Sequence, residues 1–174
     1  MNKILTEIPL GKRNNYFSGK LLSAEDFNDE QSYFLDKMRL HNRMLHGLGT
    51  VSGLEVSASE DSFNGIIVSP GVAIDPFGNE IILSSTVQCA FPEQDELAYL
   101  VLYWAERGTD PVPAPGAEGE GDQTVPSRVE EYAVLKYESE EGGNSQNGIV
   151  LARLKKEHGK WKVDKKSRVR RVKV

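Results

Sequence analysis

The chain of 174 residues has few of the cysteine and histidine residues that most often form catalytic or metal sites. It contains one cysteine, Cys89, and three histidines, which excludes an intramolecular disulfide framework and a cysteine-rich zinc module. Cys89 lies in an alternating segment and is expected to be a small, buried hydrophobe rather than a nucleophile. No window has the roughly 18 apolar residues in a row that a membrane span needs, and the N-terminal residues do not resemble a secretory signal. We therefore expect a chain that is made, and folds, in a cytoplasm.

The three histidines do not form a predicted catalytic or metal site. His158 lies in a charged turn between two expected strands. His41 and His46 are five residues apart, so on an α-helix they would point roughly 140° away from each other. Two histidines at i and i+4 could share a metal ion, but the i, i+5 spacing of His41 and His46 disfavours a shared metal site. We expect no catalytic residue, no metal ligand, no cofactor and no enzymatic activity.

Gly47, Gly49 and Gly53 do not match a nucleotide-binding loop. Three residues separate Gly49 from Gly53 where the dinucleotide fingerprint has two. The segment also follows a helix and precedes a strand, the reverse of the dinucleotide order. We expect these glycines to end the helix and to allow a tight entry into the first strand.

Charge is divided unevenly along the chain, whose formal net charge is −5. Residues 155–174 hold ten basic and two acidic residues (+8), which leaves 11 basic and 24 acidic residues (−13) in residues 1–154. Valines alternate with the terminal charges, which indicates a strand with a basic face, and the acidic remainder would repel a polyanion. We therefore expect docking on an acidic protein surface, of this chain or a neighbour, rather than nucleic-acid binding. This basic tail comprises Lys165, Lys166, Arg168, Arg170, Arg171 and Lys173.

A long helix is predicted from Ala24 to about His46. Ser23 is a good N-cap, and Asp26, three residues later, can complete a capping box. No glycine or proline interrupts the segment, and two glycines follow it as C-terminal stop signals.

Two stripes of side chains run along this helix. One has the 4-3-4-3-4 spacing of a coiled coil and is called the helix seam below. The other is a second apolar face with Tyr33, Leu40 and Met44. A helix with two apolar faces needs two partners. The protein's own sheet would be one; the other is a neighbouring subunit or, with equal weight, the N-terminal arm of residues 4–22. The helix seam comprises Phe27, Gln31, Phe34, Met38, His41 and Leu45.

From Thr50 onward, the pattern changes to short alternating segments separated by turn residues. The number, length and spacing of these segments predict an antiparallel sandwich or barrel. The expected fold class is α+β, with an N-terminal arm and one long α-helix packed on a mainly antiparallel β-sandwich or partly open barrel. The expected strands are 51–56, 65–69, 72–75, 80–83, 87–91, 97–104, 131–137, 149–154 and 160–163.

Two polar segments are expected to be insertions at sheet ends. Residues 108–127 are rich in proline, glycine and acid and lack periodicity, so they are expected to be disordered-like. Residues 138–148 form a second polar loop. The simplest division is an arm and helix at 1–49 and a β-domain at 50–174, within one folding unit.

Two stretches of the sequence resemble known proteins. The first contains Tyr16-Phe17-x-Gly19-Lys20-Leu21-Leu22 and continues through Arg39-Leu40-His41-Asn42-Arg43 to Gly53-Leu54-x-Val56; the second is Pro70-Gly71-Val72-Ala73-Ile74-Asp75-x-x-Gly78-x-Glu80-Ile81. They resemble bacterial proteins found with contractile, phage-tail-like injection systems, and parts of some baseplate or fibre proteins. The match covers about the first half specifically and the second half loosely. The resemblance implies a non-enzymatic structural subunit.

The leading hypothesis is therefore an adaptor, baseplate, cap or fibre-attachment subunit of a phage-tail-like particle, which is released or cell-associated. Its expected partners are other subunits and further copies of itself, with no nucleic acid and no membrane insertion. Gln31 and His41 in the seam would limit register and oligomeric state. The residues expected to position the helix, meet a neighbour or supply backbone geometry are Tyr16, Phe17, Gly19, Phe27, Gln31, Phe34, Met38, His41, Asn42, Arg43, His46, Gly47, Gly49 and Gly53.

The alternative hypothesis is a β-module that binds a ligand, with a glycan as the favoured class. An aromatic platform on one sheet face would carry it. Residues 99 and 103 fall on one face of an expected strand and residue 104 on the other, so some of these rings belong to the core. The candidate platform residues are Tyr99, Tyr103, Trp104, Tyr132 and Trp161.

Overall fold

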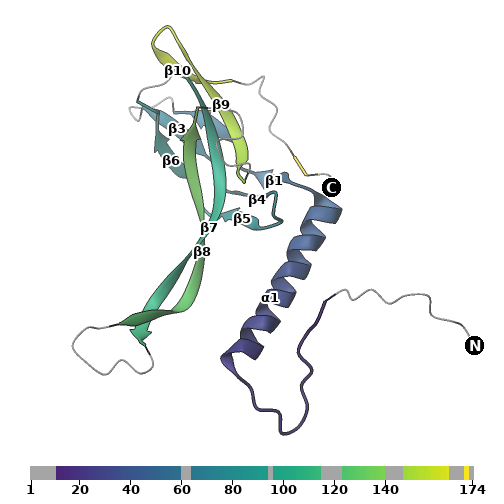
Figure 1. The fold of residues 1–174 in the computed structure, drawn as a ribbon. Helices are drawn as coiled ribbons and strands as arrows, with labels where there is room; N and C mark the ends of the chain where they lie inside the picture. The colour runs from purple at the N-terminus through teal and green to yellow at the C-terminus, as the bar shows by residue number, and fades with distance from the viewer. Residues whose placement is uncertain are drawn as a thin grey trace, which may run out of the picture.

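The computed structural model describes residues 11–59, 64–93, 96–114, 123–139, 147–164 and 171–172. An N-terminal arm and a long helix lie to one side of a β-domain (Figure 1). The predicted α+β class is confirmed. Within these residues the elements are α1 (Ala24–His41), the π-helical turn η1 (Asn42–His46), β1 (Gly49–Gly53), β2 (Val56–Ala58), β3 (Gly65–Val68), β4 (Gly71–Ile74), β5 (Glu80–Leu83), β6 (Val87–Ala90), β7 (Leu97–Pro113), β8 (Thr124–Glu138), β9 (Ile149–Glu157) and β10 (Lys160–Val163).

Three antiparallel sheets form the β-domain, with strand orders β1-β4-β5, β2-β3-β6 and β10-β9-β7-β8. Four of the pairs, β2–β3, β4–β5, β7–β8 and β9–β10, join strands that follow one another in the sequence, as antiparallel hairpins do. The pairs β1–β4, β3–β6 and β7–β9 bring together strands that are not consecutive. At the β9–β10 hairpin, His158 and Gly159 have φ values of +52° and +77°. Positive φ at both central residues is the type I′ geometry that matches strand twist.

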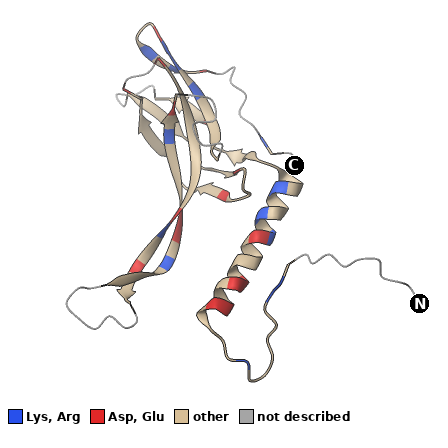
Figure 2. Ribbon diagram, viewed as in Figure 1, with Lys and Arg blue, Asp and Glu red and all other residues tan. Residues whose placement is uncertain are grey.

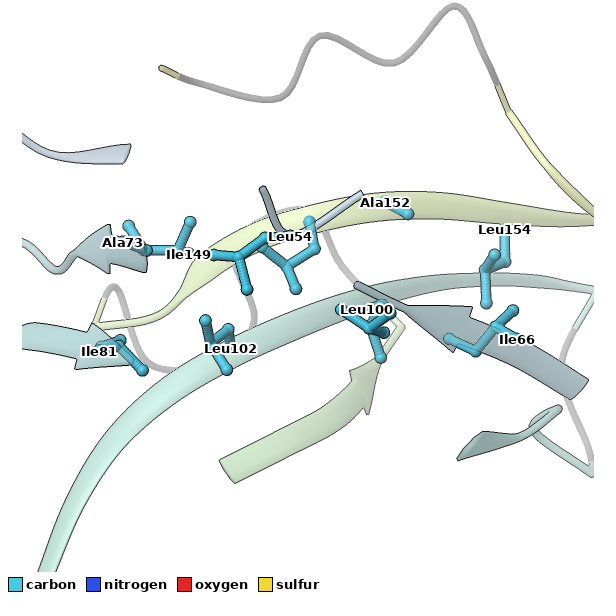
Figure 3. Close-up of a cluster of buried hydrophobic side chains, with 11 residues drawn as sticks. Leu54, Ile66, Ala73, Ile81, Leu100, Leu102, Ile149, Ala152 and Leu154 are labelled. Atoms are coloured by element: carbon cyan, nitrogen blue, oxygen red, sulfur yellow. The ribbon is translucent and has the colours of Figure 1, made fainter. Parts of the chain in front are cut away.

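One hydrophobic cluster fills the space between the sheets (Figure 3). Ile66, Leu102 and Leu154 come from three different strands and are fully buried. Alternation along the strands directs these side chains inward. The remaining members of the cluster are Leu54, Val68, Ala73, Ile81, Leu100, Ile149, Leu151 and Ala152.

The β7–β8 pair is longer than the sequence pattern predicted. Its register runs without a slip from Tyr99 opposite Glu138 to Pro113 opposite Thr124. The expectation that residues 108–127 are disordered-like is wrong for 108–113 and 124–127, which belong to strands; residues 115–122 lie outside the described residues. Beyond the core the two strands form a protruding ribbon (Figure 1). Cross-strand pairing satisfies the backbone here although few side chains are buried.

Two expected elements are divided differently in the structure. The strand expected at 51–56 is split into β1 and β2, because Gly53 and Leu54 have φ values of +60° and +57° and turn the chain so that Leu54 enters the core. The expected helix is α-helical to His41 and continues as the π-helical turn to His46. No helix in the described residues is long and apolar enough to cross a bilayer.

Candidate protein-interaction site

The first turn of α1 has a complete capping box. The Ser23 hydroxyl accepts from the Asp26 amide at 3.3 Å, and the Asp26 carboxylate accepts from the Ser23 amide at 3.0 Å. Lys20 Nζ also lies 2.8 Å from Asp26 Oδ1. These hydrogen bonds, that of Lys20 first, lower the pKa of Asp26 to about 2. The helix start is therefore fixed by its own sequence and by the arm.

The N-terminal arm covers one flank of α1. The Asn14 side chain donates to the Asp26 carbonyl, and the Tyr16 hydroxyl donates to a Glu30 carboxylate oxygen. That second bond raises the pKa of Tyr16. Further along the helix, Tyr33 is half-buried beside Gly11. The arm thus covers Tyr33 of the second apolar face, whereas Leu40 and Met44 of that face remain 43% and 70% exposed.

A buried polar network joins the other flank of α1 to the turn between β4 and β5. Asn42 is 4% exposed, and its amide donates to the Gly78 carbonyl at 2.9 Å and to Glu80 at 3.1 Å. Arg39 Nε donates to Asn79 Oδ1 at 2.7 Å. Asn79 in turn donates from its side chain and its backbone to the buried Asp75 carboxylate. Helix and turn therefore complete each other's hydrogen bonds.

Two close contacts tighten this junction. Gly78 has φ of +89°, and a Cβ there would lie 2.2 Å from the Arg39 carbonyl oxygen, so the backbones of turn and helix approach as no side chain would allow. The Arg39 guanidinium lies 5.4 Å from the centre of the Trp104 ring. Glycine at 78 is thus required by both its conformation and the close approach.

The helix seam remains uncovered between these two flanks. Phe34, Met38 and Leu45 are 61%, 55% and 65% exposed, and no residue of α1 is buried. Phe27, Gln31 and His41 are exposed as well. The β-domain contacts the helix mainly through the polar side chains of Arg39 and Asn42, so among the described residues the seam is not the face that packs on the protein's own sheet. Figure 1 shows α1 at one side of the β-domain, with its C-terminal end next to β1.

A cavity of about 710 Å³ lies beside the junction, lined in part by Asp36, Arg43, Phe77 and Trp104. Arg43 is exposed there, at the last turn of the helical segment. Figure 2 shows acidic residues toward the start of α1 and basic residues toward its end, the distribution that the helix dipole favours.

The π-helical turn brings His41 and His46 together. Their ring centres are 5.3 Å apart, with ring planes inclined at 58°. The prediction that the two rings point away from each other is wrong, because it assumed α-helical spacing throughout. The Gly47 amide instead donates to the Asn42 carbonyl at 2.9 Å, an i to i+5 bond that widens the last turn.

The predicted glycines and Phe17 lie outside this network. Gly19 has φ of +87° in a turn closed by the Lys20 amide and the Phe17 carbonyl at 3.1 Å, and Phe17 is exposed. Gly47 and Gly49 also have positive φ. A Cβ on Gly53 would lie 2.0 Å from the Pro70 carbonyl oxygen, so Gly53 permits the close approach of two backbone segments.

Most of the basic tail lies outside the described residues; of its members, Arg171 is described. Arg171 pairs with Thr50 of β1 in an isolated parallel bridge, and the Val172 amide donates to the Thr50 carbonyl at 3.1 Å. Arg171 and Val172 therefore lie beside β1. The members for which no structure is described are Lys165, Lys166, Arg168, Arg170 and Lys173.

The five aromatic residues considered for a glycan platform do not share an open face. Tyr99 is buried, and Trp161 stacks on Phe91 at 6.1 Å. Cationic side chains lie over the other rings: Arg39 over Trp104, Lys136 over Tyr103 and Arg107 over Tyr132.

Sequence reasoning missed most of the junction as a site. Asn42 was among the expected residues, whereas Arg39, Asp75, Gly78 and Asn79 were not, although they lie in or between the quoted motifs. The signal that could have found them is the pairing of a Pro-Phe-Gly-Asn turn with polar residues on a helix that is otherwise rich in apolar side chains.

Comparison with known proteins gives similarity of fold. No protein-family model and no curated protein sequence matches the chain. Similar solved structures include the type VI secretion system TssK-TssF-TssG baseplate subcomplex, at a TM-score of 0.57 and 15% identity over 91% of this chain and 61% of that one. They also include a crystal structure of TssK, at a TM-score of 0.54 and 16% identity over 88% of this chain and 40% of that one. A third is the baseplate complex from the type VI secretion system, at a TM-score of 0.55 and 16% identity over 88% of this chain and 57% of that one. The chain spans less than two thirds of each of these chains.

Proposed function

We propose that this protein is a non-enzymatic structural subunit of a phage-tail-like contractile particle, in a baseplate or adaptor position. Its fold is shared with proteins of type VI secretion baseplates, a phage-tail-like system. The sequence motifs resemble proteins of contractile injection systems independently of that fold. Both likenesses favour a subunit that functions by assembling with others.

The observation that carries the proposal is an apolar helix seam left open on a helix that is anchored elsewhere. The arm satisfies one flank of α1 and the buried network another. Between them, Phe27, Phe34 and Met38 are each more than half exposed. A contiguous apolar patch of this kind marks a protein interface more often than a monomer surface.

The proposed partners of the seam are further copies of this chain and neighbouring subunits. A coiled-coil spacing suits another helix of the same spacing. Gln31 and His41 would restrict the register in which two seams meet, because a polar side chain placed against an apolar one loses its hydrogen bonds. The basic tail would add contacts to an acidic surface of a neighbour.

The proposal is tested by co-purification. The chain carries an epitope tag in its native host, contractile particles are isolated by sedimentation, and the tag is measured in the particle fraction. We expect the wild-type chain and an Ile82→Ser variant in that fraction, because Ile82 is a 62% exposed apolar residue away from the seam. We expect Phe34→Ser with Met38→Ser to be lost from it. Absence of the wild-type chain from the particles would overturn the proposal.

A further inference from the structure

The proposed function uses His41 as a seam residue but does not use its pairing with His46 at the end of the helix. His41 and His46 are both exposed, and their ring centres lie 5.3 Å apart. They meet because the last turn is π-helical, closed by the bond from the Gly47 amide to the Asn42 carbonyl. Single π-helical turns inside α-helices are frequent at functional sites, and this one lies in the last turn of the helical segment.

The spacing of the two rings fits a shared metal ion. Imidazole nitrogen binds zinc at about 2.0–2.1 Å, and the ring centre lies about 1.2 Å beyond that nitrogen, so two rings at tetrahedral positions have centres about 5.2 Å apart. The observed separation is 5.3 Å. Because the side chains are exposed, they can turn their nitrogens toward the ion without disturbing a packed core.

We propose that His41 and His46 chelate one divalent transition-metal ion per chain. Within the described residues, no group of three or more histidine, cysteine, aspartate or glutamate side chains is placed to hold a metal ion. The ion would therefore keep coordination positions open for water or for a donor from another subunit, unlike a closed structural site with four protein ligands.

The surroundings of the pair limit which ions bind. A cavity of about 270 Å³ beside His46 is also lined by Arg43 and Arg171. Their positive charges lower the affinity for any cation. Magnesium and calcium prefer oxygen ligands, whereas zinc, nickel and copper bind imidazole strongly. The site is thus suited to ions of the zinc, nickel and copper kind.

The site lies at the edge of the helix seam, since His41 belongs to both. A metal ion here would sit on the surface that we propose meets another subunit. Chelation by the pair does not depend on that assembly, however, and is measured on the isolated full-length chain. Failure of one proposal therefore leaves the other standing.

In the experiment, zinc is titrated into metal-free protein that carries no histidine tag, and binding is measured by isothermal titration calorimetry. We expect one zinc ion per wild-type chain and affinity at least tenfold weaker in His41→Ala and in His46→Ala. The matched control is His158→Ala, at the β9–β10 turn, which we expect to bind as wild type does. Circular dichroism checks that the exposed substitutions leave the fold intact.

Two results would overturn the inference. One is wild-type affinity in the double variant His41→Ala with His46→Ala; the other is a loss of affinity from one substitution and none from the other, which would describe a single ligand. An Arg43→Ala variant tests whether the metal ion lies near Arg43, as the cavity beside His46 implies. We expect it to bind zinc a few-fold more tightly, and Arg107→Ala, on the distant ribbon, to bind as wild type does.

Discussion

At the scale of single residues, a few polar side chains decide where the helix sits. Asn42 is the most buried of them on the helical segment, and it donates one hydrogen bond to Gly78 in the β4–β5 turn and one to Glu80 at the start of β5. Of its two partners, Gly78 is buried and Glu80 is exposed, so the bond to the Gly78 carbonyl is the one that water cannot readily replace. The orientation of a 23-residue helical segment, Ala24 to His46, thus depends on a contact near its C-terminal end.

We expect Asn42→Ala to lower the free energy of unfolding by about 1–3 kcal/mol, because it leaves the Gly78 carbonyl without its donor. The measurement is urea denaturation followed by tryptophan fluorescence, since Trp104 lies under Arg39 at the same junction. Asn28→Ala, on an exposed position of α1, is the control and should change stability little. Equal effects of the two substitutions would contradict the anchoring role.

Gly78→Ala tests the close approach of helix and turn. Its Cβ would meet the Arg39 carbonyl oxygen at 2.2 Å, whereas Gly159 has a similar φ of +77° with nothing within 4 Å of a Cβ. Both substitutions strain the backbone, so Gly159→Ala isolates that effect. Overpacking costs about 1–3 kcal/mol, and we expect Gly78→Ala to be less stable than Gly159→Ala by that amount in the same denaturation experiment. Equal denaturation midpoints for Gly78→Ala and Gly159→Ala would contradict a clash between a Cβ at residue 78 and the Arg39 carbonyl oxygen.

At the scale of elements, the start of α1 is sensitive to acid. The folded pKa of Asp26 is about 2, below its ordinary value of 3.8. A lowered pKa means that the carboxylate stabilises the folded helix start above about 3.8, and that this stabilisation is lost as the pH falls through about 2. We expect ellipticity at 222 nm to exceed that of Asp26→Asn at neutral pH, and the difference to vanish in that window.

The control for this titration is Asp29→Asn in the same helix. The Asp29 carboxylate makes no hydrogen bond or ion pair within the part of the chain that the structure describes. Its replacement should therefore leave the acid transition of the wild-type protein in place. A pH-independent difference between wild type and Asp26→Asn would show that the capping box acts through shape rather than charge.

The elements that the sequence predicted well are those with strong local signals. The capping box at Ser23 and the glycine after His46 set the helical segment, and alternation located most strands. Local signals failed where pairing or backbone geometry decided the outcome. Residues 108–113 and 124–127 look unstructured alone, yet each stabilises the other across the β7–β8 ribbon.

The sequence predicted only part of the candidate interaction site, because local periodicity does not encode contacts between residues distant in the sequence. Apolar spacing identified the seam residues from Phe27 to Leu45, because helical periodicity is local. The meeting of Arg39 with Asn79 depends on contacts 40 residues apart, which no periodicity encodes. The approach of His41 to His46 depends on a π-helical turn, and average helix geometry predicts the opposite orientation.

At the scale of the whole molecule, the described residues present the helix seam, the protruding β7–β8 ribbon (Figure 1) and Arg171 beside β1 as separate exposed features. The ribbon carries an ion pair between Arg107 and Glu130 at 2.7 Å, with both side chains at least half exposed. An exposed pair of this kind adds little stability. These features enlarge the surface without enlarging the core, which suits a subunit with several neighbours.

The most direct test of the central claim is sedimentation velocity of the purified full-length chain over a range of concentrations. If the seam joins subunits, the wild-type protein and the Ile82→Ser control form oligomers as concentration rises, and Phe34→Ser with Met38→Ser stays monomeric with an unchanged midpoint of unfolding. A wild-type chain that remains monomeric at high concentration, or a seam variant that associates as the wild type does, would contradict the account.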